Sequence, residues 1–166
     1  MYFRSFLILI TSFLFCFWNS LSFSTGAGNC FSAHSYTHGH APQTGNSGFH
    51  ISIENPDVSG KSLLSVRGTR PFKGILLYVN KGSLTDLGLS NYQYKMSCED
   101  ERGAYRTVTH TSSVPKSFIS LGLELPLDIS EFFLNVVVVV EYQEWYWING
   151  TYTDFFLGAP PPSIYQ

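Results

Sequence analysis

Apolar and polar residues alternate along most of the chain after residue 48. In FHISIE, residues 49–54, the alternation predicts a strand with one buried face and places His50 outward. Ile119, Leu121, Leu123 and Leu125 repeat the same period. Turn formers such as NPDVSG, RGTRP and NKGS separate further short runs of this kind. These runs are LLSV, GILLYV, YQYKM, AYRTVTH, FFLNVVVVV and EWYWI. No segment has a sustained helical period, so the pattern predicts an all-β sandwich or barrel.

One hairpin is expected where EWYWI and TYTDFF flank Asn149-Gly150. This dipeptide favours two-residue turns because both positions accept positive φ. Asn149-Gly150-Thr151 is also the acceptor sequence for N-glycosylation, so Asn149 is a candidate modification site. The alternative is that a tight turn hides the asparagine from the transferase.

The first residues predict a signal peptide. One basic residue, Arg4, precedes an apolar run from Phe6 to Trp18, which is shorter than the roughly 20 residues that span a bilayer. Small residues follow, and cleavage is expected between residues 22 and 27. We therefore assign 1–24 to the signal peptide, 28–158 to one domain and 159–166 to a proline-rich tail. An uncleaved anchor is the alternative. We expect a secreted, extracellular protein with no membrane span after processing.

Cleavage would remove Cys16 and leave Cys30 and Cys98. Two cysteines in an oxidising compartment most simply form one disulfide. It would close a loop of roughly 70 residues, for which chain entropy gives about 4 kcal/mol of stabilisation. Two buried free thiols are the alternative.

The formal net charge of the 166 residues is −2, which argues against a nucleic-acid partner. Basic and acidic residues are concentrated in different parts of the sequence. Residues 58–85 contain bases and no acid, whereas 124–154 contain six acids and no base. The bases are Lys61, Arg67, Arg70, Lys73 and Lys81. Folding could gather them into a patch that binds sulfated glycans or anionic bacterial surfaces. The alternative is a set of separately solvated charges.

Catalytic motifs are missing from the sequence. It contains no GxSxG elbow, phosphate-binding glycine loop or dinucleotide fingerprint, and its carboxylates are scattered. We therefore predict that the protein is not an enzyme and uses no cofactor. A zinc site needs three or four converging ligands. The five histidines, His34, His38, His40, His50 and His110, are interpreted as surface or hydrogen-bonded residues, so no metal is predicted.

The order of several motifs resembles the reeler domain, the N-terminal module of reelin. The motifs are Cys30, His38-Gly39, Pro42-Gln43, FHISIE, RPFKGILLYV, Cys98, RTVTHTSS, Lys116 and a late tryptophan-bearing strand, over about residues 30–148. Two features depart from the family: LGLELP lacks a tryptophan that often precedes this proline, and a second disulfide found in some members is absent.

The resemblance implies an immunoglobulin-like antiparallel β-sandwich, with His38 and His110 in family motifs as candidate ligand or structural residues. The short layout is similar to secreted defence members, which implies a non-catalytic innate-immune protein that recognises a microbial surface component. The alternative is an extracellular-matrix or adhesion module that binds sulfated glycans. A histidine-dependent metal or redox protein is a third interpretation, ranked last.

Overall fold

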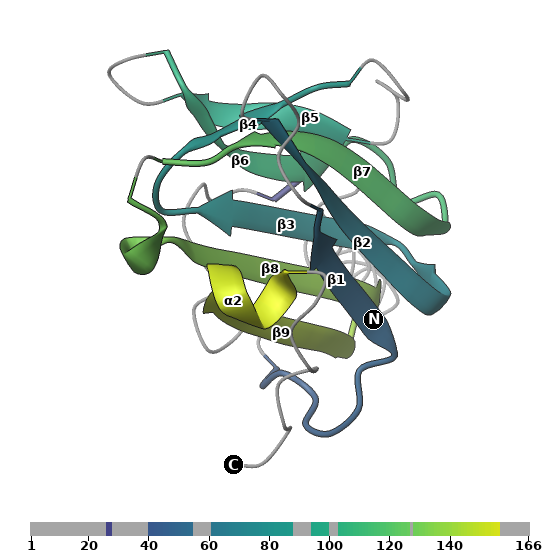
Figure 1. Cartoon of the computed structure of the whole chain (residues 1–166). Coiled ribbons are helices and arrows are strands. Elements are labelled where there is room, and N and C mark those ends of the chain that lie inside the picture. Colours follow the sequence, from purple (N-terminus) through teal and green to yellow (C-terminus); the bar gives the residue numbers. More distant parts are fainter. Residues whose placement is uncertain are drawn as a thin grey trace, which may run out of the picture.

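The computed structural model describes residues 26–27, 40–54, 61–87, 94–99, 103–126 and 128–156. Within these residues, nine strands form two antiparallel sheets that pack face to face (Figure 1). The predicted all-β sandwich is therefore confirmed. Among the described residues, no helix has the length and apolar character that a bilayer span requires.

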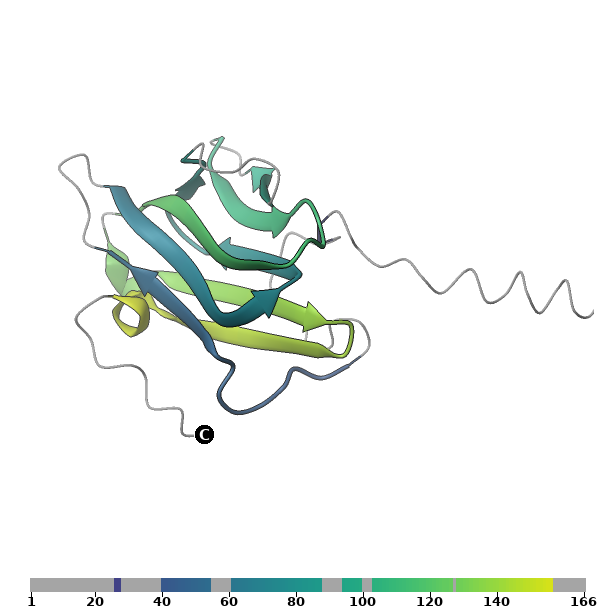
Figure 2. The same ribbon diagram turned by 90° about the vertical axis from the view of Figure 1, so that its right-hand side faces the viewer.

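The smaller sheet has four strands in the order β1-β2-β7-β4: β1 (Phe49–Ile53), β2 (Lys61–Phe72), β7 (Lys116–Glu124) and β4 (Ser83–Thr85). The larger sheet has the order β5-β6-β3-β8-β9: β5 (Tyr94–Glu99), β6 (Tyr105–His110), β3 (Gly74–Val79), β8 (Phe133–Glu141) and β9 (Glu144–Thr151). A 3-10 helix, η2 (Ile129–Glu131), precedes β8, and a one-turn helix, α2 (Tyr152–Phe155), follows β9. The two layers are seen on edge in Figure 2, where α2 lies beside β1 and β9.

The core lies between the sheets because each strand turns its alternate apolar residues inward. Ile51 and Ile53 of β1 are buried, whereas His50 between the two apolar positions is exposed, as the alternation predicts. The largest fully buried side chains include Trp145, Phe72, Phe132, Leu64, Ile75, Leu77, Leu121 and Leu134. Burying each such side chain contributes about 1.5–3 kcal/mol.

The segment RGTRP does not end a strand, contrary to the sequence prediction. It lies inside β2 as a bulge, since the pairing with β7 jumps from Arg67 opposite Phe118 to Phe72 opposite Lys116. A Cβ on Gly68 would lie 2.4 Å from the carbonyl oxygen of Arg70, so glycine permits the close approach inside this bulge. Proline is tolerated here because a bulged residue does not donate to the ladder.

The hairpin predicted at Asn149-Gly150 is wrong. Both residues lie within β9, and the turn that joins β8 to β9 is at 142–143. Gly150 has another role: a Cβ there would lie 2.9 Å from both a carboxylate oxygen of Asp154 and the ring of Phe155. Glycine therefore lets α2 fold back onto β9, and residues 152–155 form this helix instead of a strand.

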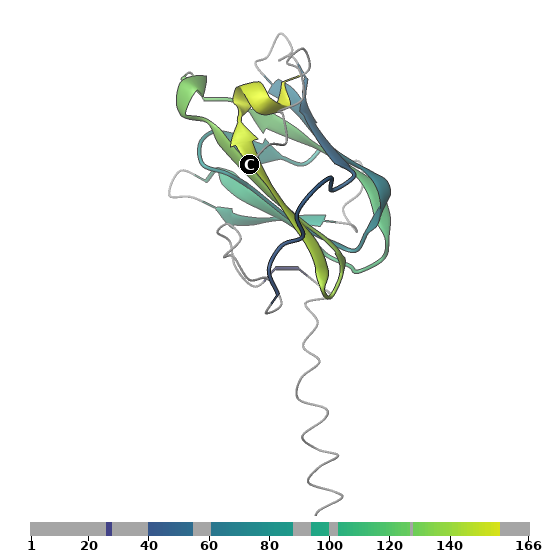
Figure 3. The ribbon, with the colours of Figure 1, turned by 90° about the horizontal axis from the view of Figure 1, so that it is seen from below.

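The two described segments before β1, residues 26–27 and 40–48, contact the larger sheet. The amide of Ala27 donates to Oγ1 of Thr109 on β6 at 2.7 Å, and the indole of Trp145 on β9 donates to the His40 carbonyl at 3.0 Å. The amide of Gln43 donates to the Trp145 carbonyl at 2.8 Å. In Figure 3 the dark blue segment that leads to β1 passes close to β9. This coverage explains why Trp145 is buried although its side chain points away from the core.

Candidate binding face

The basic segment and the acidic segment of the sequence meet across the fold. Four of the five candidate bases form ion pairs with acids between residues 124 and 144: Lys61 with Glu124 at 3.3 Å, Arg70 with Glu144 at 2.7 Å, Lys73 with Glu141 at 2.5 Å, and Lys81 with Glu131. All four pairs are partly exposed, so each contributes only about 0.2–1 kcal/mol. The pairing neutralises much of the charge that an anionic ligand would meet. The glycan-binding patch remains a prediction, and Arg67 is the one of its five bases that has no acidic partner among the described residues.

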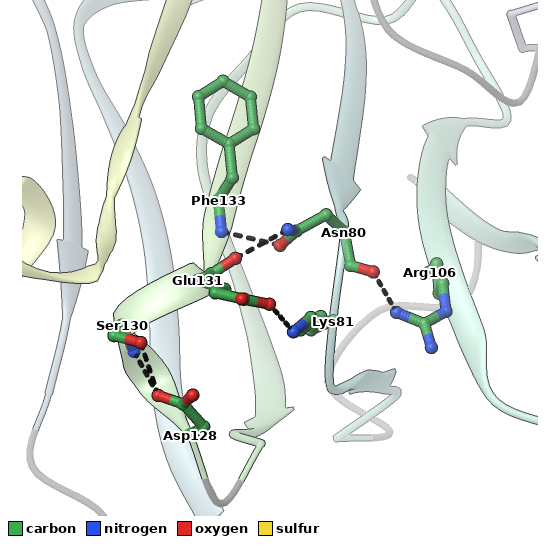
Figure 4. A network of polar contacts seen from close by, with 7 residues as sticks. All are labelled: Asn80, Lys81, Arg106, Asp128, Ser130, Glu131 and Phe133. Atoms are coloured by element: carbon green, nitrogen blue, oxygen red, sulfur yellow. Dashed lines mark hydrogen bonds and ion pairs between the residues drawn. The ribbon is translucent and has the colours of Figure 1, made fainter.

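The pair of Lys81 and Glu131 belongs to a larger network that joins four elements (Figure 4). The Asn80 amide donates to the Glu131 carbonyl at 2.7 Å, while its oxygen accepts from the Phe133 amide at 2.6 Å. Arg106 of β6 donates to the Asn80 carbonyl. These bonds fix the β3–β4 turn against η2 and β8, which is a structural role for Lys81 and its neighbours.

The Arg70 side chain contacts two aromatic residues, Tyr146 and Phe49. Its guanidinium donates to the Tyr146 hydroxyl at 2.6 Å and lies 5.3 Å from the centre of that ring and 5.9 Å from the Phe49 ring. The hydrogen bond to the Glu144 carboxylate is the main cause that raises the pKa of Arg70. Arg70 therefore ties the β2 bulge to β9.

Arg67 differs from the other four bases. It points outward from β2, and within the part of the chain that the structure describes it has no acidic partner. Its guanidinium carbon lies 4.9 Å from the centre of the Phe118 ring, a cation–π contact worth about 0.5–1 kcal/mol at an exposed site. Phe118 is 44% exposed, so its ring is accessible beside the guanidinium. His50 pairs with Arg67 from the other side, so the three residues form one row across β1, β2 and β7.

A second row of small polar residues runs beside this one. Ser52, Ser65 and Ser120 pair across the same three strands on the outer face of the sheet, where Ser65 and Ser120 are each only 8% exposed. Among the described residues, none of the three hydroxyl groups has a protein hydrogen-bond partner. We call the six residues of the two rows the Arg67 face. It combines a guanidinium that can hold a carboxylate, phosphate or sulfate in a bidentate manner, an exposed ring that can cover an apolar sugar surface, and the partly exposed hydroxyl group of Ser52.

His110 contacts the backbone of β3. It is 8% exposed at the end of β6, and its Nδ1 lies 3.2 Å from both the amide nitrogen and the carbonyl oxygen of Ile75 on β3. A Cβ on Gly74 would lie 3.2 Å from Cε1 of His110, so glycine makes room for the imidazole. The phenylalanine-x-glycine motif and the threonine-histidine-threonine motif thus meet where the chain crosses from one sheet to the other.

Lys116, the first residue of β7, contacts the segment that joins β2 to β3. Its ammonium is buried, donating to the carbonyl of Lys73 at 2.6 Å and to that of Ser112 at 3.0 Å. It also lies 5.8 Å from the centre of the Phe72 ring. No carboxylate contacts it among the described residues, and burial lowers its pKa to about 8. The sequence marked Lys116 as a motif residue and gave no sign of its burial.

The remaining predicted site residues have different outcomes. His38 and Cys30 lie outside the described residues, so a shared site of His38 and His110 and the pairing of Cys30 with Cys98 stay predictions. Cys98 is disulfide-bonded, and it adopts a positive φ of 60° in β5. Asn149 is exposed on β9. Within the described ranges no cluster of three or more histidine, cysteine or acidic side chains could hold a metal ion.

Phe118 and the serine row were missed by the sequence analysis, although a signal for Phe118 was present. Phe118 has the opposite parity to Ile119, Leu121 and Leu123, so alternation alone places its ring outside the core. The alternation pattern does not predict that Arg67 contacts Phe118, because this contact depends on β2 and β7 becoming neighbours.

Comparisons with known proteins agree with this architecture. The family model described as "Reeler domain" matches residues 29–155. The crystal structure of the Reelin-N domain of F-spondin is similar with a TM-score of 0.50 and 11% identity, covering 68% of this chain and 91% of that one. A human F-spondin reeler domain gives a TM-score of 0.49 and 11% identity, covering 68% and 93%. No protein among the curated sequences matches the chain. The matched family model covers most of the sequence, and the chain therefore belongs to the reeler domain family.

Proposed function

We propose that the protein is a secreted, non-catalytic binding protein of innate defence that recognises a microbial surface component through the Arg67 face. The observation that carries the proposal is the position of Arg67 on the exposed ring of Phe118. The reeler match and the absence of catalytic motifs from the sequence support a binding role.

The chemistry of the Arg67 face fits an acidic polysaccharide. A planar guanidinium that rests on a ring keeps its donor edges free for a carboxylate or phosphate. The ring offers an apolar surface at the same place, and the partly exposed Ser52 hydroxyl can both donate and accept hydrogen bonds. An acidic sugar unit on a bacterial or fungal surface presents these three features together, so we infer that such a unit is the ligand.

A matrix module that binds sulfated glycans is the second candidate, because a sulfate group also suits Arg67. A densely sulfated chain gains most of its affinity from many simultaneous cation contacts, however. Here Lys61, Arg70, Lys73 and Lys81 each already contact an acid. One unpaired arginine gives weak binding that salt screens readily, since the Debye length is about 8 Å at physiological ionic strength. The charge pairing therefore favours the microbial ligand.

The test compares retention of the purified, disulfide-intact protein on washed bacterial cells and on heparin beads at physiological salt. We expect retention on cells and loss from heparin. Retention on heparin alone would transfer the function to matrix adhesion. Failure to bind the bacterial cells would contradict the defence role.

A further inference from the structure

β9 is an edge strand of the larger sheet, and part of its free edge is already occupied. The Trp145 carbonyl points away from β8, because it accepts a hydrogen bond from the Gln43 amide at 2.8 Å. At the other end of the strand, the Thr151 amide donates to the Asp154 carboxylate at 2.6 Å. Backbone groups alternate between the two sides of an antiparallel strand. Those of Trp147 and Asn149 therefore also point away from β8.

These two residues form the open part of the edge. Within the described part of the chain, no other segment hydrogen-bonds to the Trp147 or Asn149 backbone on this side. The side chain of Trp147 is 39% exposed next to it. An unpaired edge with an exposed aromatic ring is a template for pairing with another chain, and proteins usually block it with a charge, a proline or a covering segment. Among the residues that the structure describes, none of these stands at Trp147 or Asn149.

The acceptor asparagine lies on this open edge. Asn149 is exposed and extended, and the tight turn that would have hidden it from the transferase is absent. Thr151, the third residue of the acceptor sequence, is exposed as well. An N-linked oligosaccharide is bulky and strongly hydrated. Attached here, it would occupy the space that a second strand needs in order to pair with β9.

We propose that Asn149 carries an N-linked oligosaccharide that covers the open part of the β9 edge and prevents two copies of the domain from pairing edge to edge. The inference rests on the secretion assumed in the proposed function, because the transferase acts inside the secretory route. It does not depend on the Arg67 face or its ligand.

The experiment uses the full chain expressed in eukaryotic cells and collected from the medium. Peptide mapping after treatment with an N-glycosidase, which converts a glycosylated asparagine to aspartate, should show aspartate at position 149. Thr151→Ser keeps both the acceptor sequence and a hydroxyl beside Asp154, so it should remain modified. Unmodified Asn149 in the secreted protein overturns the proposal. A chain that stays inside the cell overturns it together with the extracellular assignment, and the two failures are told apart by where the protein is found.

The edge role is tested with two unglycosylated variants at equal concentration. Asn149→Gln should self-associate in sedimentation experiments, whereas Asn149→Lys should stay monomeric because its charge blocks the edge without a sugar. The melting temperatures of both variants are measured to show that they are folded. A folded, monomeric Asn149→Gln variant, or equal self-association of both variants, overturns the role of the oligosaccharide at the edge.

Discussion

Replacing Phe72 by alanine is expected to lower the free energy of unfolding by about 3–5 kcal/mol. Phe72 is completely buried where the chain passes from β2 to β3. Its ring packs edge to face against Phe49 with 5.7 Å between the ring centres, and it lies below the Lys116 ammonium. Truncation leaves a cavity at the sheet crossing and removes the ring contact of a buried charge. The loss is a large share of the roughly 5–15 kcal/mol that stabilises an ordinary domain.

Phe118→Ala is the matched control for this prediction. It removes the same atoms from an exposed position on β7, so the expected change is within about 0.5 kcal/mol apart from the lost contact with Arg67. Denaturant unfolding of both variants, with the disulfide intact, gives the comparison. Equal destabilisation by the two substitutions would show that Phe72 is not the anchor of the crossing.

The second large effect concerns the pH dependence of stability around Lys116. The pKa of its amine is about 8 in the folded protein and 10.5 when unperturbed. Between these values the unfolded state holds more protons than the folded state, so stability rises with pH across this window. Below pH 8 both states are protonated, and the full cost of the buried charge remains. Relative to Lys116→Met, the wild-type protein should gain up to about 3 kcal/mol between pH 8 and 10.5.

Lys73→Met is the control, because the Lys73 side chain is exposed and only its backbone carbonyl contacts Lys116. Its stability should follow the wild-type curve over this pH range. Burial also raises the pKa of Tyr94 to about 12. Because an unfolded tyrosine ionises near pH 10, Tyr94 lowers the stability only above that pH, and it does so equally in all three proteins. Parallel curves for wild type and Lys116→Met in denaturant titrations would contradict the account of a buried, charge-destabilised amine.

The period-two pattern predicted the strands well, because burial of one face leaves a direct trace in the sequence. Ile51 and Ile53 point inward and His50 points outward, as expected. Local turn preference was less reliable. Asn149-Gly150 favours a two-residue turn, yet pairing along β8 holds both residues in β9, and the contact of α2 with Gly150 accounts for the glycine.

The candidate site was harder to predict than the fold. The segregation of bases and acids along the sequence suggested a basic patch, but strand order brings Lys73 beside Glu141 and Lys61 beside Glu124. These contacts join residues far apart in the sequence, and composition contains no information on them. Arg67 was among the five bases predicted from the sequence. Its contact with Phe118 could not be predicted, because it depends on the pairing of β2 with β7.

The most direct test of the Arg67 face is retention of four proteins on washed bacterial cells at physiological salt: wild type, Arg67→Met, Phe118→Ala and Lys73→Met. Truncating a residue central to a binding surface typically costs more than 1 kcal/mol, so Arg67→Met and Phe118→Ala should each weaken retention by about tenfold. Lys73→Met also removes one positive charge, but from a base that is paired with Glu141, and it should bind like wild type. Unchanged binding by folded Arg67→Met and Phe118→Ala, or equal weakening by all three substitutions, would contradict recognition through this face.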